Sequence, residues 1–273
     1  MSTVIHARDL TKRYGNSLAL DHASFEVESG RIVGLIGPNG AGKTTALKAI
    51  LGLTDFEGEL NVLGLDPRKQ RHELMQHVCF IADVAVLPRW IRVGEAVDFV
   101  EGVHPRFSRK RCQDFLARTK LKPTMRVREL SKGMVVQLHL ALVMAIDARL
   151  LVLDEPTLGL DIIYRKEFYQ SLLEDYFDHE RTILVTTHQV EEIERILTDL
   201  VFIKDGKITL SAPMDVVGER FTEVLVGPEQ REHALDHRRG RQGRPRGEGA
   251  RLRLAAGETL HVTAADVDCQ DFH

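Results

Sequence analysis

Apolar and polar residues alternate along the first part of the chain in a pattern that predicts β-strands. Two extended segments lie within Ser2–Glu28, and the second ends at a Ser-Gly turn signal, so an antiparallel strand pair is expected there. The apolar run Arg31–Gly37 predicts a short strand that leads into a glycine-rich turn. Helical spacing of apolar residues follows up to Gly52. This part of the chain therefore predicts strand, loop and helix in succession.

Strands and helices alternate through the rest of the chain. Further strands are expected at 60–64, 78–82, 150–153 and 182–186, and further helices at 69–77, 162–177 and 190–197. The middle of the chain shows only helical spacing, which predicts a helical subdomain at about 84–147. Asp205 and Gly206 are a strong two-residue turn signal, so a hairpin is expected at 201–210.

This alternation defines the expected fold class. Strands that alternate with helices build a mostly parallel sheet flanked by helices, which is an α/β fold. The first strand pair adds an N-terminal antiparallel β subdomain, and the helical stretch is an inserted α-helical subdomain. The folded domain is expected to span 1–221.

Composition excludes several classes of protein. Apolar residues make up 43% of the 273 residues and charged residues 28%, which is the balance of a globular protein rather than a disordered or fibrous one. The net charge of −3 gives no reason to expect a nucleic-acid partner. Cys79, Cys112 and Cys269 are widely spaced, so neither a disulfide framework nor a zinc site is expected and a reducing, cytosolic compartment is the simple interpretation. No signal peptide and no membrane-spanning segment of about 20 apolar residues is expected.

The segment 222–273 differs from the rest of the chain in composition. Eight arginines stand against three acidic residues between Arg231 and Arg253, with many glycines and little apolar periodicity. We expect a poorly ordered, Arg/Gly-rich C-terminal extension. Two alternatives stay open: contact with anionic lipid or nucleic acid, and an artefact of reading a GC-rich gene out of frame.

A phosphate-binding loop follows the strand at 31–37. The segment GPNGAGKT matches GxxxxGK[ST] and lies between a predicted strand and a predicted helix. Its glycines let the backbone bend closely around phosphates, and the N–H groups of the loop and helix N-terminus point at the anion. Lys43 supplies positive charge to the β- and γ-phosphates, and the hydroxyl of Thr44 is a ligand for Mg²⁺. The residues expected to bind the nucleotide are Gly37, Pro38, Asn39, Gly40, Ala41, Gly42, Lys43, Thr44 and Thr45.

Two acidic residues end the apolar strand LLVLDEP. Burying a charge is costly, so acids at this position indicate chemistry. Asp154 is expected at the carboxyl end of its strand, where an α/β sheet binds ligands, and is a candidate Mg²⁺ ligand. Glu155 is expected near the terminal phosphate, where it would accept a proton from attacking water. Together with the phosphate loop, these residues predict a P-loop nucleotide hydrolase core.

Further motifs give the chain a resemblance to the ATP-binding subunits of ABC transporters. LSKGM at 130–134 resembles the LSGGQ signature of that family, and His188 in LVTTHQ resembles its switch histidine. Gly159, Leu160 and Asp161 resemble the D-loop. Tyr14 in KRYGN matches the aromatic residue that stacks on adenine. The motifs occur in the family's order from Val4 to about Pro213.

The resemblance implies an ATPase that works with ATP and Mg²⁺ as part of a dimer. Two subunits, identical or different, would sandwich two ATP molecules head to tail, and Ser131 and Gly133 would contact the γ-phosphate bound by the other chain. Lys43, Glu155 and His188 would be the catalytic residues. Asp161 would lie at the nucleotide. The partner would be a separate transmembrane permease, with this subunit peripheral on the cytoplasmic face of the cell membrane.

The chain departs from the family pattern at two places. The family normally has Gln after the strand that follows the phosphate loop, and this chain has Asp83, which is expected to bind nucleotide and Mg²⁺ but offers no amide donor. Lys132 and Met134 replace the usual Gly and Gln of the signature, as in exporter-type, single-domain subunits. Trp90 follows Asp83 in the region that, in the family, meets the permease, and it is expected either as an interface anchor or as a core residue.

The sequence therefore predicts an ATP-hydrolysing motor subunit of an ABC transporter that drives export. One alternative is an ABC-type ATPase that acts on nucleic acid or ribosomes, although the spacing between Gly37 and Asp154 has room for one helical subdomain only. The other alternative is a weakly hydrolysing regulatory subunit of a heterodimer, suggested by Asp83 and the altered signature.

Overall fold

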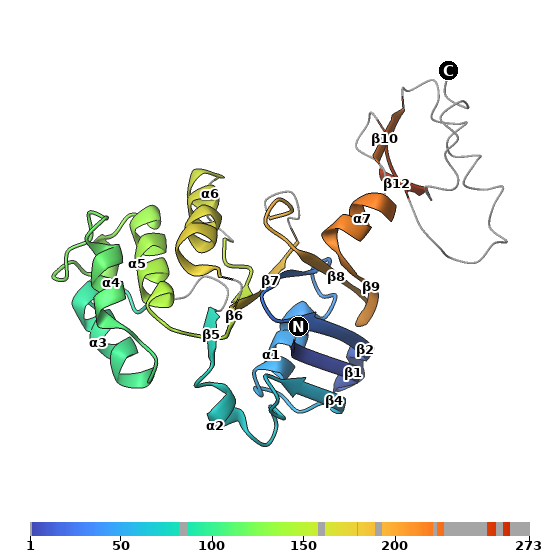
Figure 1. The fold of residues 1–273 in the computed structure, drawn as a ribbon, viewed down its shortest axis with the longest axis horizontal. Helices are drawn as coiled ribbons and strands as arrows, with labels where there is room; N and C mark the ends of the chain where they lie inside the picture. Colours follow the sequence, from blue (N-terminus) through green and yellow to red (C-terminus); the bar gives the residue numbers. More distant parts are fainter. Residues whose placement is uncertain are drawn as a thin grey trace. The chain divides into compact units, whose positions relative to one another are not determined.

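The protein was analysed as a computed structural model (Figure 1). The structure describes residues 2–81, 87–157, 162–178, 180–188, 193–220, 223–226, 250–254 and 259–262. The chain forms two compact units, 1–211 and 212–273. The first unit contains the sheets and helices that build the candidate site.

Three strands form an antiparallel sheet in the order β2-β1-β4. Their bounds are β1 Thr3–Tyr14, β2 Ser17–Glu28 and β4 Glu57–Val62. The predicted N-terminal strand pair is confirmed. The inward side chains of β1, among them Ile5 and Leu10, are fully buried, while its far end carries Arg13 and Tyr14 as exposed residues.

A second sheet has six strands in the order β5-β6-β7-β3-β8-β9. The bounds are β3 Ile32–Ile36, β5 Val78–Ile81, β6 Leu150–Asp154, β7 Thr182–Thr187, β8 Asp199–Lys204 and β9 Lys207–Pro213. The pairings β5–β6, β6–β7, β7–β3 and β3–β8 are all parallel. Every residue of β3, β6 and β7 is buried, as expected for a sheet covered on both faces. The mostly parallel sheet is confirmed, and its strands deliver their carboxyl ends to one edge.

The hairpin β8–β9 forms at the predicted turn. Asp205 has φ 50° and Gly206 has φ 77°, so both central residues adopt the left-handed conformation that a type I′ turn requires. The turn contacts the rest of the unit through Gly206, whose N–H donates to the carbonyl of Ala41 at 2.9 Å and whose carbonyl accepts from the N–H of Asp21 at 2.9 Å. The hairpin therefore ties β2 to the phosphate loop.

Helices flank the sheet and form the inserted subdomain. Their bounds are α1 Lys43–Ile50, α2 Arg71–Leu74, α3 Val93–Val103, α4 Arg109–Leu116, α5 Lys132–Met144 and α6 Ile162–Ser171, with a 3₁₀ turn η1 at Val127–Glu129 and a π-helical turn η2 at Leu172–Tyr176. Helices α3, α4 and α5 lie side by side (Figure 1). Their buried residues, including Val93, Cys112 and Leu138, form a core of their own. The predicted α-helical subdomain is confirmed.

One predicted helix is shorter than the apolar spacing suggested, and another is not found over its described part. The helix expected at 69–77 covers only α2, because the N–H groups of Gln76 and His77 donate to carbonyls three residues back, those of Glu73 and Leu74, instead of continuing the α-helix. The helix expected at 190–197 is wrong over its described part, where 193–196 form a turn. The chain leaves that turn at once because the N–H of Thr198 must pair with the carbonyl of Ile32 next to β3.

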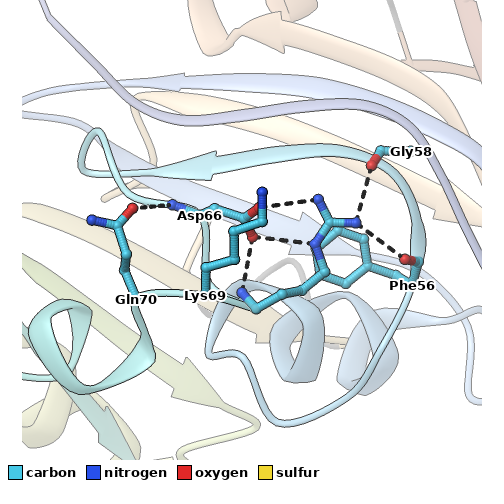
Figure 2. A network of polar contacts seen from close by, with 6 residues as sticks. Phe56, Gly58, Asp66, Lys69 and Gln70 are labelled. Atoms are coloured by element: carbon cyan, nitrogen blue, oxygen red, sulfur yellow. Dashed lines mark hydrogen bonds and ion pairs between the residues drawn. The ribbon is translucent and has the colours of Figure 1, made fainter.

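A polar network fixes the connection between β4 and α2 (Figure 2). The carboxylate of Asp66 accepts from the backbone N–H of Arg68 at 2.9 Å and from its guanidinium at 3.1 and 3.2 Å. The guanidinium of Arg68 also donates to the carbonyl of Phe56 and stacks over its ring. Hydrogen bonding to Arg68 lowers the pKa of Asp66. The segment after β4 is thereby held against the start of that strand.

The second unit holds helix α7 at Met214–Arg220 and a three-stranded sheet in the order β10-β11-β12. The strand bounds are β10 Glu223–Val226, β11 Ala250–Leu254 and β12 Thr259–Val262. β10 pairs with β11 in parallel, and β11 pairs with β12 antiparallel. Most of 222–273 lies outside the described residues, so the boundary at 221 and the poor order expected beyond it stay predictions.

Candidate nucleotide-binding site

The phosphate loop connects the central strand β3 to helix α1, as predicted. Gly37 must be glycine, because a Cβ there would stand 2.1 Å from the carbonyl oxygen of Ile203 in β8. Gly42 has φ 111°, and a Cβ there would meet the carbonyl of Ala19 at 2.5 Å. The loop is thus pressed between β8 and β2, and its backbone follows a path that side chains would block.

Lys43 begins α1 and reaches back over the loop. Its Nζ donates to the carbonyl of Gly37 at 2.7 Å and to the carbonyl of Pro38 at 3.2 Å. The same atom lies 3.5 Å from Oε1 of Glu155. Lys43 is 6% exposed, and a buried ammonium needs such partners. The positive charge is therefore held at the N-terminus of α1.

The two acids at the end of β6 have different surroundings. Asp154 is buried, and its Oδ1 accepts a hydrogen bond of 2.7 Å from Oγ1 of Thr186 on β7. Glu155 follows with φ 47°, a left-handed conformation that is uncommon for a residue with a Cβ and that is often found at functional sites. Its N–H donates to the carbonyl and to Oγ1 of Thr186, at 3.2 and 3.1 Å. Thr186 thus fixes both acids.

The side chain of Glu155 joins Lys43 to His188. Its Oε2 lies 2.9 Å from Nδ1 of His188, while its Oε1 faces Nζ of Lys43. A carboxylate only accepts hydrogen bonds, so with Glu155 ionised Nδ1 is the protonated nitrogen of His188. The side chain of Glu155 is 16% exposed, and that of His188 is 32% exposed. A carboxylate is therefore presented with a cation on one side and an imidazole on the other.

Lys43, Glu155 and His188 line a cavity of about 400 Å³, and Asp154 and Thr186 are not among its lining residues. Its walls come from β2, the phosphate loop, α1 and the ends of β6 and β7. The lining residues are Ala19, Asn39, Gly40, Gly42, Lys43, Thr44, Thr45, Glu155 and His188. Backbone N–H groups at a helix N-terminus, one ammonium and nearby hydroxyls make this cavity suited to a chain of phosphates.

Tyr14, Ser131 and Gly133, three described residues of the predicted site, are not among those that line the cavity. Tyr14 ends β1 with 47% of its surface exposed and is not among the residues that line the cavity. Ser131 is the N-cap of α5, where its Oγ accepts from the N–H of Met134 at 3.3 Å, and Gly133 is buried in the first turn of that helix. Neither lines the cavity within this chain. Asp83 and Asp161 lie outside the described residues.

The exposure of Trp90 decides between the two interpretations of this residue, an interface anchor or a core residue. It is 70% exposed, so the interpretation as a core residue is wrong. Phe99 and Val103 on α3 are also exposed apolar residues, at 64% and 63%.

Sequence reasoning missed three contributors to the site. Thr186 bonds both acids, Ala19 lines the cavity, and Gly206 supports the loop backbone. Two buried threonines, Thr186 and Thr187, at the carboxyl end of β7 were a readable signal for Thr186. Ala19 and Gly206 carry no such signal, because their roles depend on how β2 and the hairpin pack against the loop.

The fold and the site define a P-loop nucleotide hydrolase. The comparison with known families agrees and is more specific: residues 20–158 match the ABC transporter family. The chain belongs to the ABC transporter family as an ATP-binding subunit, an ATPase that drives transport.

Individual relatives support this assignment. The ABC transporter ATP-binding protein YtrB of Bacillus subtilis is 28% identical over 223 residues, which cover 82% of this chain and 76% of that protein. The Nod factor export ATP-binding protein I of Burkholderia lata is 36% identical over 223 residues, covering 77% and 71%. The probable multidrug ABC transporter ATP-binding protein YbhF of Escherichia coli is 34% identical, but the alignment spans only 34% of that protein.

Solved structures agree on the fold. A structure of an ATP-binding subunit of an ABC transporter superposes with a TM-score of 0.69 at 24% identity, covering 85% of this chain and 94% of the other. The structure of cbiO1 from Clostridium perfringens gives a TM-score of 0.69 at 22% identity, covering 88% and 97%. Among the described residues, no helix has the length and apolar character needed to cross a bilayer.

Proposed function

We propose that this subunit hydrolyses ATP at composite sites formed head to tail with a second ATP-binding subunit and drives export through a separate permease. The observation that carries the proposal is the contact of Glu155 with both Lys43 and His188 at the rim of the phosphate cavity. Export is supported by relatives described as acting in Nod factor export and bacitracin transport.

The three side chains have separate roles in the proposed reaction. Lys43 neutralises charge on the β- and γ-phosphates, where it is held by the loop carbonyls. Glu155 polarises the attacking water and accepts its proton. His188 donates from Nδ1 to the carboxylate of Glu155 and thereby orients it towards the attacking water. Catalysis is then mainly positioning and charge neutralisation.

The lining residue Thr44 and the neighbouring buried residue Asp154 fit a Mg²⁺ ion. Mg²⁺ prefers oxygen ligands, keeps several waters and is usually bound by one or two protein groups together with substrate phosphates. Thr44 offers a hydroxyl at the cavity, and Asp154 offers a carboxylate whose orientation Thr186 fixes. Asp83 is a further proposed ligand. The ion would neutralise charge on the β- and γ-phosphate oxygens.

The second subunit would complete the site through α5. Its first turn carries Ser131 and Gly133, and a helix N-terminus with free N–H groups attracts a phosphate. Since neither residue lines the cavity of its own chain, a second copy or a related subunit would have to supply them. Asp161 would lie near the same interface between the two subunits. The subunit would bind peripherally to the cytoplasmic face of the membrane, with Trp90 as an exposed anchor for the permease.

The regulatory alternative remains less well supported. It is suggested by Asp83 and by the altered signature, whereas the contact between Glu155 and His188 supports a hydrolysing subunit. No observation on the described residues favours an ATPase that acts on nucleic acid or ribosomes.

The test is Mg²⁺-dependent ATP hydrolysis by the purified chain over a range of protein concentrations, with Glu155→Gln as the comparison. The proposal predicts that specific activity rises with concentration and that Glu155→Gln binds ATP but does not turn it over. A wild type that binds ATP and is inactive at every concentration would overturn self-assembly of the sites. Turnover by Glu155→Gln would overturn the role of the carboxylate.

A further inference from the structure

Lys12 and Tyr14 lie two residues apart on β1, and their side chains are in contact. Nζ of Lys12 stands over the Tyr14 ring, 4.9 Å from its centroid. This is within the distance at which a cation is attracted to an aromatic face. The hydroxyl of Tyr14 lies 3.5 Å from Oγ1 of Thr54. One face of the ring is thus in contact with an ammonium, while 47% of the residue is exposed.

The ammonium of Lys12 is itself fixed. The side chain is 9% exposed, and its Nζ donates to Oδ1 of Asp55 at 2.6 Å. Asp55 and Thr54 belong to the segment that follows α1, so the two contacts tie the end of β1 to the helix that starts at the phosphate loop. The hydrogen bond from Lys12 also lowers the pKa of Asp55. Lys12 is therefore held beneath the ring by a carboxylate on another element.

This end of β1 borders the nucleotide cavity. Lys12 pairs with Leu20 in the β1–β2 register, and the neighbouring residue Ala19 lines the cavity. The carbonyl of Ala19 lies close to Gly42 of the phosphate loop. A nucleotide whose phosphates lie in the loop would extend its base along this end of the β1–β2 pair.

We propose that Lys12 is a positioning residue for base recognition: it holds the ring of Tyr14 in the orientation that stacks on the nucleotide base. The inference rests on the proposed function of the site as an ATP site. A ring that is already held loses less conformational freedom on binding than a mobile one. Lys12 should contribute to binding of the nucleotide base and not of the phosphates, because its ammonium is directed to Asp55 and the Tyr14 ring rather than to the phosphate loop.

The test compares ADP, which carries a nucleotide base, with inorganic pyrophosphate, which does not. Lys12→Met keeps the length of the side chain and removes its charge. We expect the dissociation constant of ADP and the KM for ATP to rise about two- to fivefold, with kcat unchanged. Isothermal titration calorimetry measures the dissociation constants of ADP and of inorganic pyrophosphate, and that of pyrophosphate should be unchanged. Lys12→Arg should restore the affinity for ADP.

Two comparisons separate this role from general effects. Arg13→Met removes the same charge from the next, exposed residue of β1 and should leave ADP affinity unchanged. In a Tyr14→Leu background, Lys12→Met should have no further effect on ADP binding. Equal weakening of ADP and pyrophosphate, or an undiminished effect without Tyr14, would overturn the inference.

If Lys12→Met does not fold, Asp55→Asn is the variant to measure. It keeps Lys12 but removes the charge that holds it, and it should weaken ADP binding in the same direction. Unchanged ADP affinity in Asp55→Asn would then overturn the inference. A wild type that binds neither ADP nor pyrophosphate would contradict the proposed function itself, and the positioning role would fall with it.

Discussion

Thr186 donates a hydrogen bond of 2.7 Å from its Oγ1 to Oδ1 of Asp154, directly across the β6–β7 register in which the two residues are paired. The same hydroxyl accepts from the N–H of Glu155. A fully buried hydroxyl therefore orients both acids of the site, although it lies outside the cavity. The orientation of Asp154 and Glu155 therefore depends on a residue that is not itself expected to touch the nucleotide.

Replacing this hydroxyl tests its importance. Thr186→Val keeps the shape but leaves the buried Asp154 without its donor, so we expect a loss of about 1–3 kcal/mol in the free energy of unfolding, measured with denaturant. The Mg²⁺ concentration needed for half-maximal ATPase activity should also rise. Thr186→Ser retains the hydroxyl and should keep most of the Mg²⁺ affinity. Equal Mg²⁺ dependence in both variants would contradict this role.

Two glycine substitutions should have opposite effects on stability. A Cβ at Gly37 would stand 2.1 Å from the carbonyl of Ile203, so Gly37→Ala should destabilise the protein by about 1–3 kcal/mol or more and impair nucleotide binding. Gly102 in α3 has open space around its Cβ position. Gly102→Ala should therefore stabilise the protein by about 0.5–1 kcal/mol and leave ATP binding unchanged. Both effects are measured by thermal and denaturant unfolding, and stabilisation by Gly37→Ala would disprove the packing of the loop against β8.

The partly buried residue His139 on α5 predicts a pH dependence of stability. Burial on α5 lowers the pKa of His139 to about 4, and its Nε2 is buried without a hydrogen-bond partner among the described residues. Because the ordinary pKa is 6.5, the unfolded chain binds more protons between these values. Neutral His139 therefore makes its full contribution to the free energy of unfolding above pH 6.5. The free energy of unfolding falls by about 3 kcal/mol as the pH falls from 6.5 towards 4.

The variant His139→Leu isolates this effect. It cannot bind the proton, so the unfolding free energy of the wild type should fall more steeply than that of the variant between pH 6.5 and 4. Denaturant unfolding at a series of pH values measures the difference. Parallel pH profiles would mean that His139 does not contribute to the pH dependence.

Much of the fold followed from local patterns. The β3–loop–α1 unit, the acids that end β6 and the hairpin turn at 205–206 were all predicted, because each is encoded by residues close together in sequence. The helix expected at 190–197 failed over 193–196, since pairing of Thr198 with Ile32 is set by the sheet rather than by apolar spacing.

The missed parts of the site depend on long-range pairing. Thr186 reaches Asp154 only because β6 and β7 are adjacent and in register. Gly206 supports Ala41 only because the hairpin lies over the phosphate loop. The buried threonine could be noticed in the sequence, but no local pattern predicts which residue Thr186 or Gly206 contacts. The motifs predicted which residues carry the chemistry, and the strand order determined which residues hold them.

The central claim is that each ATP site uses Lys43 of one subunit and Ser131 of the other. The most direct measurement mixes two inactive variants, Lys43→Ala and Ser131→Arg, and assays ATP hydrolysis. In a mixed dimer one site carries both substitutions and the other carries neither, so mixing should restore a substantial fraction of wild-type activity. An active wild type whose two variants stay inactive when mixed would contradict the composite site.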